Sequence, residues 1–345
     1  MKPLPEKESG VGAGPVVAAG VGSRPLVDLA ARSLGGSVMA ANDESFGEKE
    51  NLVLDRPVAF VPGRFGHKGE VVDGWETRRR RPVAGFDWAV VRLGAPGVIR
   101  EVDVETTAFT GNFPDRCRVE AVAAQGYPSA EELSGWRELV PVSALAGDAH
   151  NVFAVDSPRR YTHVRLSIYP DGGVGRLRVR GHVVPDPARF IGQTVDLAAA
   201  ELGAVVESTS DAFYTSPSVL LMPGTARHMG EGWETRRQRG DDHDWLVVRL
   251  ATRGVLRELE VDTTYYVCNA SGEVGLWGAD LGAAGGDAAP QGAHWVPVLP
   301  RIAVQPDTRH LFDVTGAGPF THVRLDAFPD GGLSRLRVRG TAVPA

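Results

Sequence analysis

Short runs of alternating hydrophobic and polar residues recur along the whole chain. Residues 100–106 (REVDVET), 162–169 (THVRLSIY) and 175–181 (GRLRVRG) each switch between an apolar or β-branched residue and a charged or polar one. A period of two predicts β-strands that bury one face and expose the other. The turn sequence PDGG, at 170–173 and 329–332, separates such runs. The pattern therefore predicts a fold built from strands and tight turns.

Only two segments favour a helix, DLAAR at 28–32 and DLAAAEL at 196–202, and both are short. The 42 glycines and 24 prolines are spread along the chain, as is typical of all-β proteins with many turns. No apolar run reaches the ~18 residues that a transmembrane helix needs, so we expect no membrane span.

A long internal repeat organises the chain. The hexapeptide GWETRR occurs at 74–79 and again at 232–237, and residues 161–184 match residues 320–343. The matching segments lie about 160 residues apart, which is far longer than the ~20–50 residues of a solenoid repeat. The sequence therefore indicates a duplicated domain.

These observations predict two tandem β-sandwich domains of the jelly-roll type. We place the first repeat at 25–186 and the second at 187–345, with the boundary in the proline-containing stretch VVPDPARF at 183–190. Residues 1–24 are interpreted as a flexible tail. A signal peptide is the minor alternative, because the apolar stretch is broken by glycines and follows acidic residues.

Charge and cysteine content narrow the class of protein. The net charge is −6, which gives no bulk electrostatic reason to expect nucleic acid or an anionic membrane as partner. Cys117 and Cys268 are too few for a disulfide framework and occupy non-equivalent places in the two repeats. We interpret each as a small core residue in a protein of the reducing cytoplasm.

The GWETRR segment has two interpretations. In the structural one, Trp75 anchors a loop and Glu76 pairs with an arginine. In the functional one, the arginines present planar, bidentate donors to a ligand that carries a carboxylate. The residues alone leave both open. The basic run Arg78–Arg81 is weak evidence for nucleic acid in an acidic protein.

The polar faces of the strands also have a structural interpretation. The acids of one strand can pair with the arginines of another; these are Glu101, Asp103 and Glu105, and Arg176, Arg178 and Arg180. Glu105 is the exception, because it leads into the loop at 106–114, where functional residues are more common. His163 lies beside Arg165, and no spacing typical of a metal site, catalytic serine or phosphate-binding loop occurs.

Taken together, the motifs resemble the allantoicase family. The resemblance rests on DGWETRR followed by DW, an acid before the TTAFTGNFP loop, WRELV, and HVRL…YPDGG…RLRVRG. It covers nearly all of residues 25–345, in both repeats and in order. It implies two jelly-roll domains of galactose-binding-like topology, a homo-oligomer, and hydrolysis of the small molecule allantoate to ureidoglycolate and urea.

Allantoate carries a carboxylate and two ureido groups on one carbon, so its site needs a carboxylate clamp, proton-transfer groups and amide partners. We assign Arg78 and Arg79 to the clamp. The proton-transfer candidates are Glu76, Glu105 and His163, and the remaining substrate-binding candidates are Asn112, Trp75 and Asp171, the last also a second acid. The spacing of the residues does not demand a cofactor, and a divalent metal with carboxylates and His163 or His67 as ligands stays open.

The two repeats differ in how well they keep these motifs. The first has ENL at 50–52 and FTGNFP at 109–114, whereas the second has YVCNAS at 266–271 in place of that loop. We therefore expect the first repeat to be the active domain, and the second to serve as scaffold or interface. The alternative from another class is a tandem ligand-binding module without catalysis, since fold alone does not decide function.

Overall fold

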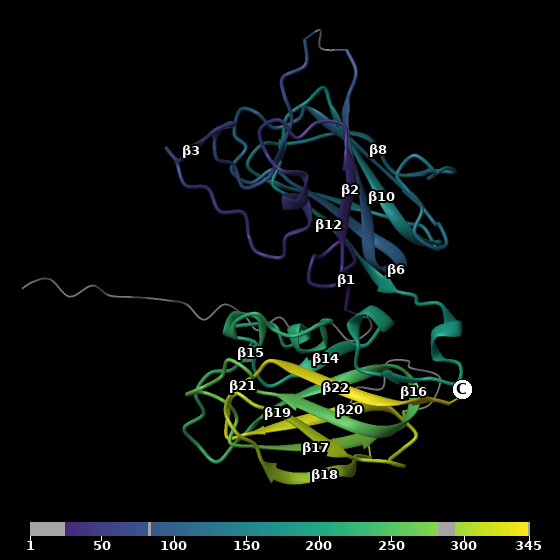
Figure 1. Ribbon diagram of the computed structural model, residues 1–345, viewed down its shortest axis with the longest axis vertical. Coiled ribbons are helices and arrows are strands. Elements are labelled where there is room, and N and C mark those ends of the chain that lie inside the picture. Colours follow the sequence, from purple (N-terminus) through teal and green to yellow (C-terminus); the bar gives the residue numbers. More distant parts are fainter. Residues whose placement is uncertain (1–24, 82–83, 282–293, 344–345) are drawn as a thin grey trace, which may run out of the picture.

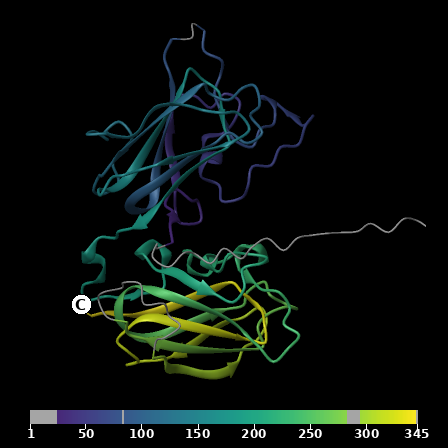
Figure 2. The same ribbon diagram turned by 180° about the vertical axis from the view of Figure 1, so that it is seen from behind.

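The structure is a computed structural model that describes residues 25–81, 84–281 and 294–343. The chain forms two β-sandwich domains that follow one another along the longest axis of the molecule (Figure 1), and the view from behind shows the same order (Figure 2). The tail predicted for residues 1–24 lies outside the described residues. The described part contains no α-helix, and no helix that could span a membrane was found in it.

The first sandwich contains one eight-stranded sheet and two small ribbons. Its strands are β1 (Val27–Asp28), β2 (Ser37–Ala41), β3 (Phe65–Gly66), β4 (Gly69–Glu70), β5 (Trp75–Glu76), β6 (Asp87–Glu105), β7 (Arg116–Val122), β8 (Arg137–Ala144), β9 (His150–Ala154), β10 (Arg160–Tyr169), β11 (Gly173–Val174) and β12 (Arg176–Val183).

The second sandwich repeats the eight-stranded sheet, with the order β13-β22-β16-β20-β17-β18 matching β1-β12-β6-β10-β7-β8. Its β15–β21 ribbon matches β5–β11, whereas the β3–β4 ribbon has no counterpart among the described residues of the second repeat. Its strands are β13 (Thr194–Asp196), β14 (Val205–Thr209), β15 (Trp233–Glu234), β16 (Asp244–Asp262), β17 (Glu273–Ala279), β18 (Val296–Ala303), β19 (Arg309–Asp313), β20 (Phe320–Phe328), β21 (Gly332–Leu333) and β22 (Arg335–Ala342). The prediction of a duplicated all-β fold is confirmed.

One long strand connects the two layers of each sandwich. The first half of β6 pairs with β2 and β10, and its second half pairs with β9 and β12. Because β6 changes partners along its length, a single sheet wraps into two facing layers, as in a jelly roll. The same strands leave their ends, and the loops between them, at two opposite ends of the sandwich.

The alternation in the sequence correctly predicts the core. Val102 and Val104 of β6 are fully buried, as are Val164, Leu166 and Ile168 of β10. The polar face of β10 differs from the expectation, because His163 and Ser167 are buried as well. Strand β10 lies in the middle of the sheet, between β6 and β7, and Arg165 and Tyr169 of the same polar face are only half-buried.

Two smaller expectations are wrong. The segments expected to be helical form turns instead: Asp28 and Asp196 accept hydrogen bonds from the amides of Ala30 and Ala198, which favours a turn over a helix. The second repeat has only a single 3-10 turn there, η3 (Ala200–Leu202). The other 3-10 turns are η1 (Lys49–Val53), η2 (Pro187–Phe190), η4 (Pro217–Leu221) and η5 (Met229–Glu231).

The second wrong expectation concerns the cysteines. Cys117 is buried in the core as predicted, but Cys268 is exposed. Cys268 lies between β16 and β17, in the loop that replaces FTGNFP in the second repeat, where no core surrounds it. Both thiols are free.

Candidate active site

The GWETRR segment of the first repeat is held at one end of the sandwich by its tryptophan. Trp75 is fully buried, and its indole Nε1 donates a 2.7 Å hydrogen bond to the carbonyl oxygen of Asp43. The next anchor is Thr77, whose amide donates to the carbonyl of Gly172 at 3.1 Å. Trp75 is therefore a structural anchor rather than a surface that substrate can reach.

Asp43 also fixes the first arginine. Its carboxylate accepts hydrogen bonds from the backbone amide of Arg78 at 2.9 Å and from the Nε of Arg78 at 2.5 Å. Burial by itself would raise the pKa of Asp43, but the hydrogen bonds from Arg78 and Ser45 lower it below its ordinary value. Asp43 is thus a carboxylate that orients Arg78, a pairing that the structural interpretation assigned to Glu76.

Glu76 has a different partner. Strand β5 pairs with β11, which places Glu76 opposite Gly173, and the Glu76 carboxylate accepts a 2.8 Å hydrogen bond from the amide of Asn112. Burial raises the pKa of Glu76 above its ordinary value, although the bond from Asn112 partly opposes the shift. No arginine or lysine pairs with Glu76 within the described part of the chain. This half-buried carboxyl can therefore hold or release a proton closer to neutral pH.

The PDGG turn makes room for this arrangement. A Cβ atom added to Gly173 would lie 2.0 Å from the ring of Phe109, and one added to Gly74 would lie 2.7 Å from the same ring. Both glycines are required because the Phe109 ring packs directly against the β5–β11 ribbon. The ring gives Glu76 an apolar neighbour on its own side of the ribbon.

The remaining arginines border a hollow of about 440 Å³. Its lining includes Asn42, Asp43, Arg78, Arg79, Arg80, Arg81, Ala84 and Asp87. The backbone amide of Arg80 donates to Asp171 at 2.6 Å, and its Nε donates to Asp87 at 3.0 Å. Arg79 is exposed and forms no hydrogen bond or ion pair with any residue that the structure describes. Arg79 is thus the arginine best placed to take a ligand, whereas Asp171 serves to hold the loop.

Glu105 lies at the same end, at the last residue of β6. Its carbonyl oxygen accepts from the amide of Gly175 at 2.7 Å, and its side chain lies on the outer face of the sheet opposite Arg176. Glu105 is only 6% exposed, yet Arg176 forms its ion pair with Asp73, at 3.0 Å. The expected pairing between the acids of β6 and the arginines of β12 is found for Arg180, which pairs with Glu101 and, at 3.7 Å, with Asp103. Arg178 pairs with Asp28 instead.

His163 is not brought to this end. It lies six residues before Tyr169 on β10, and at about 3.3 Å per residue the two ends of that segment are roughly 20 Å apart. Burial, followed by the charge of Arg92, lowers the pKa of His163. His67 is exposed in the β3–β4 turn. Across residues 25–81, 84–281 and 294–343, no three His, Cys, Asp or Glu side chains are grouped to hold a metal.

Asp43 and Asp73 are not among the residues predicted from the sequence, yet both form ion pairs at the GWETRR segment. Asp73 pairs with Arg176 and Arg56, and Asp43 with Arg78. A signal was present for Asp43, because Asp211 occupies the same place in the second repeat. There Trp233 donates to the carbonyl of Asp211 at 2.9 Å.

The second repeat retains the central pair. Asn269 donates to the carboxylate of Glu234 at 2.9 Å, just as Asn112 does to Glu76. Its surroundings differ, because Tyr266 stands in place of Phe109 and Gln238 in place of Arg80. The acid equivalent to Glu105 is Asp262, and it is engaged by the amide of Thr264 at 2.8 Å.

Comparison with known proteins decides the family. The allantoicase repeat, as a family model, matches residues 27–184 and again 195–343. The chain belongs to the allantoicase family. It is 48% identical to a probable allantoicase of Nocardia farcinica, over 92% of this chain and 95% of the relative. It is 46% identical to a probable allantoicase of Streptomyces coelicolor, over 91% of this chain and 85% of the relative.

A solved structure of the same family has the same fold. The crystal structure of allantoicase from Saccharomyces cerevisiae superposes with a TM-score of 0.78 at 30% identity, covering 91% of this chain and 93% of that chain. The resemblance drawn from the motifs is therefore confirmed. Both halves of the allantoicase family match are β-sandwiches that present a GWETRR segment beside a PDGG turn.

Proposed function

We propose that the protein hydrolyses allantoate to ureidoglycolate and urea at the GWETRR end of the first repeat. Membership of the allantoicase family supports the reaction. The observation that supports the location is the half-buried Glu76 carboxyl, oriented by Asn112 at 2.8 Å. Two residues further along the chain begin the arginines that line a hollow of about 440 Å³. One short segment thus supplies both a candidate proton-transfer group and a candidate carboxylate clamp.

Hydrolysis requires a water oxygen to bond to the central carbon while the bond from that carbon to one ureido nitrogen breaks. One proton leaves the water and one reaches the departing nitrogen, so urea and ureidoglycolate balance allantoate and water. Glu76 is our candidate for moving that proton, because its raised pKa brings its two protonation states closer in energy near neutral pH. Glu105 is the second acid at this end and stays a candidate for the same work.

The arginines orient the substrate. Arg79 is exposed and available to a carboxylate, and Arg78 is held in place through its Nε by Asp43. A planar guanidinium matches a carboxylate in two parallel hydrogen bonds, which fixes the substrate as well as binding it. Asn112 holds the Glu76 carboxylate, and its amide is our candidate for contacting a ureido group.

The test is urea release from the purified full-length chain supplied with allantoate, with and without EDTA. Saturable release of one urea per allantoate is the expected result. Release that stops with EDTA and returns with a divalent ion would add a metal to the site. A correctly folded chain that releases no urea, even with added divalent ions, would contradict the proposed reaction and leave the ligand-binding module as the better account.

Two further properties belong to the proposal. We infer a cytoplasmic enzyme, supported by two free thiols in the described chain. The resemblance to the allantoicase family supports a homo-oligomer, and light scattering of the purified protein tests that state directly.

A further inference from the structure

The first repeat carries a second hollow at the other end of the sandwich from the GWETRR segment. It measures about 420 Å³ and includes Arg137 on β8, Tyr161 on β10 and Arg159 just before β10. Tyr161 is eight residues from Tyr169, the residue at the GWETRR end of the same strand, so roughly 26 Å separates the two places. The hollow is therefore distinct from the candidate active site.

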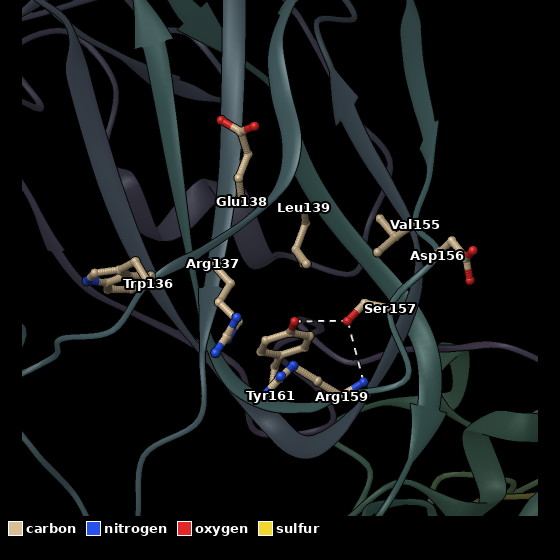
Figure 3. A pocket seen from close by; sticks show the side chains of 9 residues that line it. All are labelled: Trp136, Arg137, Glu138, Leu139, Val155, Asp156, Ser157, Arg159 and Tyr161. Atoms are coloured by element: carbon tan, nitrogen blue, oxygen red, sulfur yellow. Dashed lines mark hydrogen bonds between the residues drawn. The ribbon is translucent and has the colours of Figure 1, made fainter.

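Two arginines dominate one side of this hollow. Arg137 and Arg159 are both exposed, and neither guanidinium forms a hydrogen bond or ion pair with any residue that the structure describes. An adjoining hollow of about 380 Å³ shares Arg137, Arg159 and Tyr161 as lining. Figure 3 shows both guanidinium groups beside the ring of Tyr161. Two arginines without a protein carboxylate as partner among the described residues thus line the same hollow as the buried ring of Tyr161.

The carboxylates of the hollow do not neutralise these arginines. Glu138 and Asp156 line the same space, but Figure 3 shows their carboxylates turned away from the two guanidinium groups. Neither acid forms an ion pair within the described ranges. The hollow therefore has two guanidinium groups without a protein carboxylate as partner in the described structure, and two further carboxylates among its lining residues.

The ring at its centre is held rigidly. Tyr161 is only 3% exposed, and its hydroxyl lies 2.9 Å from the hydroxyl of Ser157. Trp136 also lines the hollow, and the Cζ atom of Arg165 lies 4.6 Å from the centre of the Trp136 ring. A rigid aromatic floor with charged groups around it is typical of sites for small polar ligands.

The second repeat shows that these charges are not needed for the fold. Strand pairing makes Arg137 equivalent to Val296, because they face Ala121 and Gly278 in the matching strand pairs. Tyr161 and Phe320 are equivalent in the same way, facing Gly97 and Gly254. The second repeat carries none of the hollow's charges: Val296 stands for Arg137, Pro297 for Glu138, Thr315 for Asp156, Gly318 for Arg159 and Phe320 for Tyr161.

We propose that this hollow is a second binding site, specific to the first repeat, for a small organic carboxylate that also carries N–H donors. The guanidinium groups of Arg137 and Arg159 bind the carboxylate, since paired guanidinium groups match its oxygens. Glu138 and Asp156 accept hydrogen bonds from the N–H groups at the other side. An exposed pair of like charges that no protein carboxylate relieves is stabilised by such a ligand.

Calorimetric titration of the full-length chain with N-carbamoylglycine, which has one carboxylate and one ureido group, tests the site. The variant R137V/R159G installs the residues of the second repeat. The matched control R189G/R257V removes two exposed arginines elsewhere, on η2 and β16. We expect R137V/R159G to lose one class of binding sites or to bind at least tenfold more weakly, and the control to titrate like the wild type.

Identical isotherms for the wild type and R137V/R159G would overturn the proposal. If R137V/R159G fails to fold, as judged by circular dichroism, R137K/R159K replaces it. R137K/R159K keeps the positive charges and loses the paired guanidinium donors. If this variant binds N-carbamoylglycine as tightly as the wild type does, the proposal is also overturned. Release of urea from allantoate should stay within about twofold in R137V/R159G, and a larger fall would contradict two separate sites.

A second titration tests the selectivity for N–H donors. In the wild type, acetate should bind this site at least tenfold more weakly than N-carbamoylglycine. The variant E138Q/D156N should weaken N-carbamoylglycine and leave acetate unchanged. Equal affinity for the two compounds in the wild type would overturn the roles of Glu138 and Asp156.

Discussion

Among single residues, the proposed proton transfer depends most on the environment of Glu76. The carboxylate has one described partner, Asn112, and burial outweighs that bond in raising its pKa. Asp43 shows the opposite balance, since its hydrogen bonds from Arg78 and Ser45 outweigh burial and lower its pKa. The pKa values of two acids at the same end of the sandwich are thus shifted in opposite directions, which is a common arrangement in active sites.

The raised pKa of Glu76 predicts a stability effect of known sign. A pKa that is higher in the folded than in the unfolded state favours the folded state below the unfolded value, and this contribution is lost as pH rises through the folded value. E76Q stays neutral and can still accept from Asn112. Its free energy of unfolding should therefore exceed that of the wild type at pH 7, and the gain should disappear near pH 4. Urea unfolding at both pH values measures it, and a constant difference would contradict the shift.

His163 predicts the opposite pH dependence. Burial lowers its pKa, and its Nε2 has no hydrogen-bond partner in the described structure. A lowered histidine pKa means that stability is complete above the unfolded value and falls as pH decreases through it, toward the folded value. H163Q should flatten the loss of stability between about pH 7 and pH 5. Thermal melts across that range measure the effect.

The same variant tests whether His163 takes part in catalysis. Its distance of roughly 20 Å from the GWETRR end predicts that H163Q keeps its rate of urea release within about threefold. A fall of a hundredfold in kcat with unchanged folding would return His163 to the proton-transfer candidates.

At the scale of elements, the site depends on how the GWETRR segment is fastened to its neighbours. The amide of Thr77 donates a hydrogen bond to the carbonyl of Gly172 in the PDGG turn, and the amide of Arg78 donates one to Asp43. Both hydrogen bonds recur in the second repeat, from Thr235 to Gly331 and from Arg236 to Asp211. Their recurrence indicates that the GWETRR motif is doubled first of all because the fold needs it.

Replacing Asp43 distinguishes the structural role of the GWETRR segment from its role in binding substrate. D43A leaves the backbone amide and the Nε of Arg78 without their acceptor, so we expect a loss of about 1–3 kcal/mol in the free energy of unfolding. We also expect a larger KM for allantoate, because Arg78 is no longer oriented. D211A in the second repeat is the control, and it should lower stability without changing KM. Denaturant unfolding and initial rates of urea release measure both effects.

Sequence patterns predicted the strands well and the contacts of the site poorly. Alternation along 100–106 identified Val102 and Val104 as core, because the period of two maps directly onto the faces of a strand. The partner of Glu76 was not predictable in this way, since Asn112 meets it only through the fold of a distant loop. His163 was misplaced for a different reason: it lies six residues before Tyr169, the residue at the GWETRR end of β10. The position of a residue along a strand decides which end it reaches, and composition does not show that.

For the whole molecule, the duplication raises the question of which repeat carries the proposed reaction. Both sandwiches keep a glutamate bonded to an asparagine, at 2.8 Å in the first and 2.9 Å in the second. They differ in what surrounds the pair, since Phe109, Arg80 and the glycine and proline of the FTGNFP loop are found only in the first. The hollow at Arg137 and Arg159 adds a second difference at the opposite end. The first repeat thus carries the features that a duplicated scaffold alone does not require.

The most direct test compares urea release by the wild type, E76Q and E234Q, with folding checked by circular dichroism. Removing a proton-transfer group typically costs 10²–10⁴-fold, so the account predicts a loss of about that size in E76Q and a rate near that of the wild type in E234Q. Equal losses in the two variants would contradict the assignment of the reaction to the first repeat, and full activity in E76Q would contradict the role given to Glu76.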